Sequence, residues 1–246
     1  MKIRYATFCE AGLRQVNEDC IGVASIPGQD RTMFILCDGM GGHANGSLAS
    51  KIITDVFVNY WVKRPEFKDC SKKVLEACHK ASVKFDRVSF DHMPMQMGST
   101  MVLASIEGNK ITIAHIGDSR CYLLRRSKKI EPDSVSIPCA NADDIDVIYQ
   151  TEDHVDVQKG WDVVSRCFFS FRPEEAVPDI RQYELYPGDV IFLCSDGVNK
   201  YIRPDIMKAR LMDERTPEEI AEVIKFLCEK DSLDNYTGIV VQVQCI

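Results

Sequence analysis

The first third of the chain changes its hydrophobic period from that of strands to that of helices. Short apolar runs at 20–25 and 33–37 predict two strands, the second ending in a glycine-rich loop. Over 48–61 apolar residues recur at four-residue steps, and over 71–90 they recur at steps of four and three. Both patterns are typical of amphipathic helices. We expect these two helices to pack antiparallel.

Strand periodicity returns in the middle of the chain. The runs 100–106, 111–116 and 121–124 are separated by a turn at 107–110 and a break at Gly117-Asp118. They predict a three-stranded β-meander. A further hairpin is predicted for 182–194, where two apolar runs flank Pro187-Gly188-Asp189 and Asp189 is interpreted as a turn residue.

The second half of the chain contains one segment with a weak secondary-structure signal and two segments with clear ones. Residues 127–180 are polar and rich in turn residues, with a weak strand signal at 147–149. A last helix is predicted to begin at Thr216 with a capping box that includes Glu219, and to end near Lys230. Residues 238–244 predict a closing strand. Because hairpins dominate, we expect an α+β fold of mostly antiparallel sheets with helices outside, forming one domain over 1–246.

Composition narrows the function classes. The chain of 246 residues carries 30 basic and 37 acidic residues, a net charge of -7 with no basic block, which argues against nucleic acid or an anionic membrane as partner. No window is apolar enough for a membrane span, and the first residues lack the apolar stretch of a signal peptide. Eleven scattered cysteines without a C-x-x-C pair favour a reducing, cytoplasmic location.

Acidic residues stand where several predicted strands end or begin. Taken alone, Asp-Gly after an apolar run is typical of a hairpin turn, but here the pattern recurs at Glu18, Asp19, Asp38, Asp118, Asp196 and Asp234. If these strand ends meet, the carboxylates must either protonate or bind cations, because like charges a few ångströms apart repel strongly. Oxygen ligands without paired His or Cys favour Mg²⁺ or Mn²⁺. Gly39, Gly41 and Gly42 would let the backbone approach such an ion.

Six segments in this order make the chain resemble a known family. The segments RQVNED, DGMGGH, GSTMVLASI, GDSR, SDG and DNYT are similar to those of the metal-dependent protein serine/threonine phosphatases, the PPM or type-2C family. The resemblance extends over residues 14–241. It implies a four-layer α-β-β-α sandwich of two sheets with the metals at one edge, and phosphorylated proteins as substrates. We expect a monomer.

The resemblance also implies a role for each acidic residue. Asp38 would bridge two metals, with the carbonyl of Gly39 on one of them, and Asp196 and Asp234 would complete the other site. Glu18, with Asp19 beside it, would act on the metals directly or through water. Asp118 matches a position that helps hold a weaker third metal in many members. Arg14 would bind the substrate phosphate, and a hydroxide shared by two ions would attack phosphorus in line.

The chain departs from the family pattern near the expected site. Met40 stands where some members carry a histidine proposed as general acid, and His43 is a minor alternative. His154 belongs to a T-x-D-H segment that we interpret as structural. Residues 125–180 correspond to the family's flap and its surroundings, but match it poorly, so they do not reveal substrate preference. Trp61 and Trp161 are interpreted as packing residues.

Other functions fit the sequence less well. A cysteine phosphatase needs His-Cys followed by Arg, and here no cysteine is preceded by His. Asp144-Ile145-Asp146 follows a polar loop, unlike the nucleophile of an aspartyl-phosphate enzyme. GGHANGS lacks the lysine of a P-loop. A catalytically silent relative that binds phosphoproteins as a scaffold remains the alternative, although the presence of every metal acid favours activity.

Overall fold

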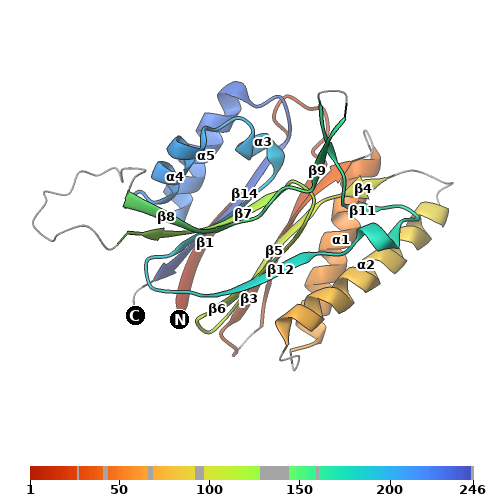
Figure 1. The fold of residues 1–246 in the computed structure, drawn as a ribbon, viewed down its shortest axis with the longest axis horizontal. Helices are drawn as coiled ribbons and strands as arrows, with labels where there is room; N and C mark the ends of the chain where they lie inside the picture. Colours follow the sequence, from red (N-terminus) through yellow and green to blue (C-terminus); the bar gives the residue numbers. More distant parts are fainter. Residues whose placement is uncertain are drawn as a thin grey trace, which may run out of the picture.

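Two antiparallel β-sheets lie face to face, and helices cover the outer face of each (Figure 1). The structure is a computed structural model that describes residues 1–26, 28–40, 44–65, 69–91, 97–127, 144–158 and 161–244. The α+β class and the four layers predicted from the family resemblance are confirmed. None of the helices in these ranges is both long and apolar enough to cross a membrane.

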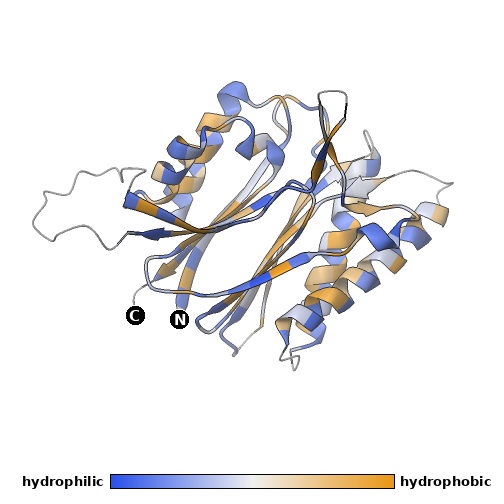
Figure 2. Ribbon diagram, viewed as in Figure 1, coloured by the Kyte–Doolittle hydropathy of each residue, from blue (hydrophilic) through white to orange (hydrophobic). Residues whose placement is uncertain are grey.

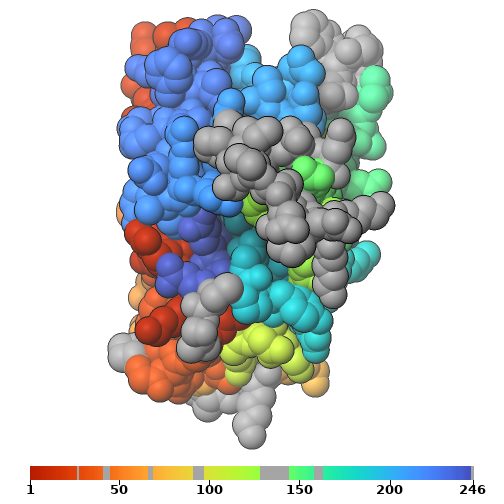
Figure 3. Space-filling view, turned by 90° about the vertical axis from the view of Figure 1, so that its left-hand side faces the viewer, coloured from red at the N-terminus to blue at the C-terminus, as the bar shows by residue number. Residues whose placement is uncertain are grey.

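The first sheet carries both ends of the chain. Its strand order is β1 (Lys2–Glu10), β14 (Tyr236–Gln244), β13 (Val190–Cys194), β7 (Arg120–Arg126) and β8 (Ile145–Gln150). Helices α4 (Pro204–Leu211) and α5 (Pro217–Asp231) cover its outer face, and the short α3 (Asp196–Asn199) follows β13. In the side view, N-terminal residues lie beside C-terminal ones, as the β1–β14 pairing requires (Figure 3).

The second sheet carries the two helices predicted first. It pairs β2 (Asp19–Ser25), β3 (Arg31–Met40), β5 (Met101–Glu107), β6 (Lys110–Ile116) and β12 (Asp179–Glu184) in that order, and β4 (Gly98–Ser99) and β11 (Phe168–Phe169) extend the end of β3. Helices α1 (Ala44–Lys63) and α2 (Cys70–Asp91) cover it. A separate hairpin of β9 (Val155–Gln158) and β10 (Trp161–Val164) stands beside this sheet, followed by the 3₁₀ turn η2 (Pro173–Glu175).

The apolar run before Asp38 is explained by burial on both faces of β3. Phe34 and Leu36 point into the core between the sheets, whereas Ile35 and Cys37 pack against the layer of α1 and α2. All four side chains are fully buried. The hydropathy colouring shows the same arrangement, with hydrophobic colour on the inner strands and the helix faces that meet them (Figure 2).

The predicted meander and the predicted hairpin at 182–194 are both wrong. Strands β5 and β6 pair as expected, but β7 pairs with β13 and β8 in the other sheet. Likewise β12 pairs with β6, while β13 pairs with β7 and β14. Both connections therefore cross between the sheets. Gly117 marks the first crossing, with φ +105° and no room for a Cβ, which would lie 2.6 Å from Thr100 Cγ2.

The other predicted elements are found, and some were missed. The helices over 48–61 and 71–90 and the closing strand are confirmed, and Thr216 and Glu219 form the predicted capping box of α5. Sequence reasoning missed β1, the β9–β10 hairpin and α4. Strand β1 has few buried positions, and α4 has only two buried residues, so neither shows a clear period. Trp61 is buried as predicted, whereas the side chain of Trp161 lies outside the described residues.

Asp189 holds the second crossing between the sheets. Its carboxylate is fully buried and accepts two hydrogen bonds from Arg125, at 2.6 Å from Nε and 2.8 Å from Nη2. The same carboxylate accepts the backbone N–H of Tyr186 at 2.8 Å. Asp189 therefore lies in the turn, as predicted, and also ties that turn to β7.

We expect Asp189→Ala to lower the free energy of unfolding by about 2 kcal/mol, because the Arg125 guanidinium and the Tyr186 amide lose their shared acceptor. Urea unfolding followed by circular dichroism measures the change. Asp146→Ala, which removes an exposed carboxylate on neighbouring β8, is the control and should stay within about 0.5 kcal/mol of the parent. Equal losses in the two variants would contradict this account of the crossing.

Candidate metal centre

Five aspartates meet at one edge of the sandwich. Asp19 and Asp38 are direct partners on antiparallel β2 and β3. The other three come from separate places, since Asp118 follows β6, Asp196 begins α3 and Asp234 precedes β14. The pKa of Asp38 is raised well above its ordinary value, first by loss of hydration and then by the negative charges of these four neighbours, Asp19, Asp196, Asp118 and Asp234. The four residues therefore act electrostatically on one carboxylate.

Asp19 is buried, and only one of its two carboxylate oxygens has a hydrogen-bond partner among the described residues. Its Oδ2 accepts the hydroxyl of Ser195 at 2.8 Å, but its buried Oδ1 has no hydrogen-bond partner among the described residues. Burial is the main cause that raises the pKa of Asp19 to about 7. The nearby hydroxyls of Thr237 and Ser195 oppose this shift, and the charges of Asp196 and Asp234 add to it. A cation beside Asp19 would lower this pKa and give Oδ1 a partner.

Backbone contacts bring Glu18 and Gly39 to the same edge. The N–H of Gly39 donates to the carbonyl of Glu18 at 3.1 Å, and the N–H of Glu18 donates to Asn235 Oδ1 at 2.9 Å. A Cβ at Gly39 would lie 2.0 Å from the carbonyl oxygen of Gly46, so only glycine fits where β3 approaches α1. The Glu18 carboxylate lies against this first turn of α1, near Gly46. Residues 41–43, including His43, lie outside the described residues.

Two basic side chains contact the aspartates. Arg14 Nη2 donates to Asp234 Oδ2 at 2.8 Å, and the charge of Asp234 is the main cause of the raised pKa of Arg14. Lys200 Nζ donates to Asp196 Oδ2 at 2.7 Å and to Asp118 Oδ2 at 3.3 Å. Sequence reasoning found Arg14 but missed Lys200. The available signal was its position four residues after Asp196, where the two side chains meet on one helical face.

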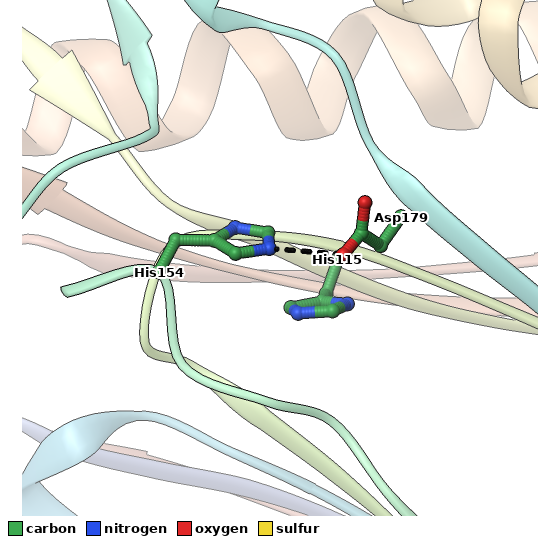
Figure 4. Close-up of side chains that lie close together, drawn as sticks. All are labelled: His115, His154 and Asp179. Carbon is green, nitrogen blue, oxygen red and sulfur yellow. Dashed lines mark hydrogen bonds and ion pairs between the residues drawn. The ribbon is translucent and has the colours of Figure 1, made fainter.

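A second cluster supports the loop that carries Asp118. His154 stacks on His115 with ring centroids 4.5 Å apart and an interplanar angle of 17° (Figure 4). The N–H of Gly117 donates to His154 Nδ1 at 3.0 Å, so His154 Nε2 carries a proton and faces Asp179 Oδ2 at 3.3 Å. His115 Nε2 donates to the carbonyl of Glu152 at 2.8 Å. These contacts hold Gly117, next to Asp118, and support the structural interpretation of His154.

This histidine cluster is the one group of three His, Cys, Asp or Glu side chains in the described ranges whose ligand atoms all lie within 4.8 Å. Stacked rings direct their in-plane lone pairs side by side, however, and these do not converge on one ion. Burial is also the main cause of the lowered pKa of both His115 and His154. No three of the five aspartates place one carboxylate oxygen each within 4.8 Å of one another in the described part of the chain.

The donor set at the sheet edge fits a hard divalent ion. It combines carboxylate oxygens with a backbone carbonyl at Gly39, and the buried Oδ1 of Asp19 lacks the partner that a cation would supply. A cavity of about 590 Å³ opens next to this edge. It is lined by Met40, by the β10 hairpin strand and by Phe169, Arg172 and Glu175. None of the five aspartates lines this cavity, and Met40, two residues after Asp38, is the lining residue nearest to them in β3.

Comparison with known proteins agrees with this geometry. The model of the family "Protein phosphatase 2C" matches residues 11–236. The chain is 27% identical over 244 residues to the serine/threonine protein phosphatase PstP of Mycobacterium tuberculosis, which covers 98% of this chain and 45% of the relative. It is 28% identical over 217 residues to the protein phosphatase PhpP of Streptococcus pneumoniae, with 84% of each chain covered. The chain thus spans less than half the length of PstP but most of PhpP.

One solved structure bears directly on the metals. The catalytic domain of PstP in complex with two manganese ions superposes with a TM-score of 0.79 at 25% identity, and 99% of each chain is covered. The fold of that domain is therefore shared over nearly the whole of this chain.

We expect Asp19→Asn protein to be more stable than the parent at pH 8 in EDTA, and the difference to shrink towards pH 5. The folded-state pKa of Asp19, about 7, lies above its unfolded value of 3.8, so the parent loses stability as pH rises through this window. The limiting slope is about 1.4 kcal/mol per pH unit. Thermal unfolding at each pH measures it, and the histidines contribute equally to both proteins. A difference that does not change with pH would contradict the raised pKa.

Proposed function

The chain belongs to the protein phosphatase 2C family, and from this premise we propose that it hydrolyses phosphoserine and phosphothreonine in phosphorylated proteins. The observation that carries the proposal is the meeting of five aspartates at one sheet edge, with a raised pKa at Asp38 that its four aspartate neighbours help cause. Such a cluster needs cations, and members of this family depend on metal. PstP, a relative with the same fold, holds two manganese ions.

We assign the metal ligands to the acids and the carbonyl at this edge. Asp38 and the Gly39 carbonyl would hold one ion, Asp38 with Asp196 and Asp234 the other, and Glu18 and Asp19 would contact the ions directly or through water. Either Mn²⁺ or Mg²⁺ suits these oxygen donors. Bound divalent ions lower the pKa of coordinated water and offset negative charge on a phosphoryl group.

We assign the binding of the substrate phosphate to Arg14. Its side chain is 56% exposed and is oriented by Asp234, which we assign to the metal centre. A planar guanidinium donates two parallel hydrogen bonds to phosphoryl oxygens and offsets their charge without losing its own. Arg14 therefore fixes the phosphoryl group against the acidic edge.

The cavity beside Met40 suits the residues that flank a phosphorylated side chain. It begins one residue after Gly39, so a peptide that presents its phosphate to the aspartates has room there for its neighbouring side chains. Arg172 lines it, bonded to Glu175 at 3.2 Å and lying over the ring of Phe169. Met40 carries no proton to donate, so it does not assist departure of the alkoxide as a general acid.

The remaining assignments concern the setting of the enzyme. We propose one catalytic domain over residues 1–246, acting as a monomer in the cytoplasm. The nine cysteines within the described residues are free thiols, which suits a reducing compartment. A net charge of -7 does not suit nucleic acid as a partner. The scaffold alternative is not favoured, because the chain retains all of the acids that we assign to the metals.

We expect the protein to hydrolyse an aryl phosphate and phosphothreonine peptides in the presence of Mn²⁺, and EDTA to abolish both activities. Asp38→Asn and Asp196→Asn should each lower kcat/KM by about 10³-fold, since each removes a charged ligand worth several kcal/mol. Asp205→Asn, which changes an exposed acid on α4, is the matched control and should leave turnover unchanged. Unchanged turnover in the first two variants would contradict the assignment. A folded wild type without turnover in Mn²⁺ or Mg²⁺ would favour the scaffold.

Arg14→Ala should raise KM for a phosphothreonine peptide about tenfold or more, because one charged hydrogen-bonding partner of the phosphate contributes about 1.5–3 kcal/mol. Arg14→Lys keeps the charge but loses the planar fork, so we expect an intermediate KM. Steady-state kinetics at saturating Mn²⁺ separates KM from kcat. If both variants behave like the parent, Arg14 does not bind the phosphate.

A further inference from the structure

Lys200 places a positive charge between two of the clustered aspartates. It is the residue directly after α3, and its N–H donates to the carbonyl of Asp196 at 3.0 Å, which continues the helical turn. The Nζ atom lies 2.7 Å from Asp196 Oδ2 and 3.3 Å from Asp118 Oδ2. One ammonium group therefore joins two carboxylates that come from different sheets.

The surroundings fix Asp118 in position for this contact. The Asp118 side chain is only 6% exposed, and its carbonyl accepts Asn199 Nδ2 at 3.4 Å. On its other side, Ser119 shares a hydrogen bond of 2.7 Å with Thr100. Asp118 and Lys200 thus both sit on backbone that is held by neighbouring residues, so the pair is built into the fold.

The Lys200 ammonium, which is positively charged at neutral pH, lies at hydrogen-bond distance from both carboxylates. The Asp118 side chain is only 6% exposed, so its carboxylate needs a positive charge close by. The ammonium therefore provides the positive charge that a buried carboxylate at this position requires.

The family resemblance implies a weaker third metal ion at Asp118, and Asp118 is the carboxylate that Lys200 contacts. A divalent ion binds carboxylate oxygen at about 2.0–2.6 Å. At that distance from Asp118 Oδ2 it would stand a few ångströms from the Lys200 ammonium, where two cations repel strongly. The third ion and the ion pair therefore exclude each other.

We propose that the Lys200 ammonium takes the place of a third divalent ion at Asp118, so that the enzyme works with two bound ions and one cation of its own. The inference rests on the proposed two-ion centre and deepens it. Asp118 is then a partner of Lys200 and not a metal ligand. A lysine ammonium is a fixed single charge and carries no coordinated water. The positive charge beside Asp118 therefore does not vary with the concentration of divalent metal.

The test counts bound Mn²⁺ on folded protein by equilibrium dialysis and by electron paramagnetic resonance of the free ion. We expect the wild type to bind two ions and Asp118→Asn also to bind two. Lys200→Asp replaces the ammonium with a third carboxylate and should bind three ions, the last more weakly. Lys208→Met on α4, a lysine without an ion pair to any described residue, is the matched control and should bind two.

The number of bound Mn²⁺ ions decides whether Asp118 pairs with Lys200 or binds a third ion. Three ions in the wild type, or the loss of one ion in Asp118→Asn, would overturn the inference while leaving the proposed phosphatase function intact. Two ions in a folded Lys200→Asp would also overturn it. If that variant does not fold, the wild type and Asp118→Asn decide the question by themselves. No bound Mn²⁺ in any protein would overturn the proposed function together with the inference.

Discussion

Repulsion among carboxylates at one sheet edge is the constraint on which the rest of this structure depends. Asp38 stands among four other aspartates, and Asp19 has a buried oxygen without a hydrogen-bond partner in the described part of the chain. A fold that gathers these groups is less stable than one that separates them unless cations offset their charge. The proposed metal binding and phosphate chemistry follow from this constraint, and so do the contacts of Lys200 and Arg14 with the aspartates.

Connections that cross between the two sheets bring these acidic residues together. Strand β6 ends two residues before Asp118 and the chain then passes to the other sheet, where β13 ends two residues before Asp196. Asn235 joins the two halves of the edge. Its side chain accepts the N–H of Glu18 and donates to the carbonyls of Ala11 and Val16, so the Arg14 loop is fixed beside Asp234. Acids far apart in sequence thereby share one place.

The sequence was sufficient for most of the helices and strands and for the acids that gather at one edge, but not for the sheet pairing. Helices over 48–61 and 71–90 have a strong period because one face of each is buried. Strands β7 and β13 are buried on both faces, so their apolar runs do not reveal which sheet they join, and neighbouring runs with a short turn between them resemble hairpins. The β9–β10 hairpin and the edge strand β1 bury few of their described side chains, so their short apolar stretches do not stand out from a loop. Only the structure could place them.

Lys200 was missed for a different reason. A lysine four residues after an aspartate is common on exposed helices, where such pairs contribute little to stability. Its importance arises from Asp118, which is 82 residues away in sequence and contacts the same ammonium. Because that second contact depends on two crossings of the chain, no local pattern predicts it. The family resemblance implies a weaker third ion at Asp118, whose carboxylate lies 3.3 Å from the Lys200 ammonium.

The most direct test of the central claim is an anomalous difference map from crystals grown with Mn²⁺, recorded near the manganese edge. The account predicts two strong peaks within coordination distance of the Asp38 carboxylate, one of them shared with Asp196 and Asp234. A map in which no peak lies near Asp38, although Mn²⁺ is bound elsewhere on the protein, would contradict it.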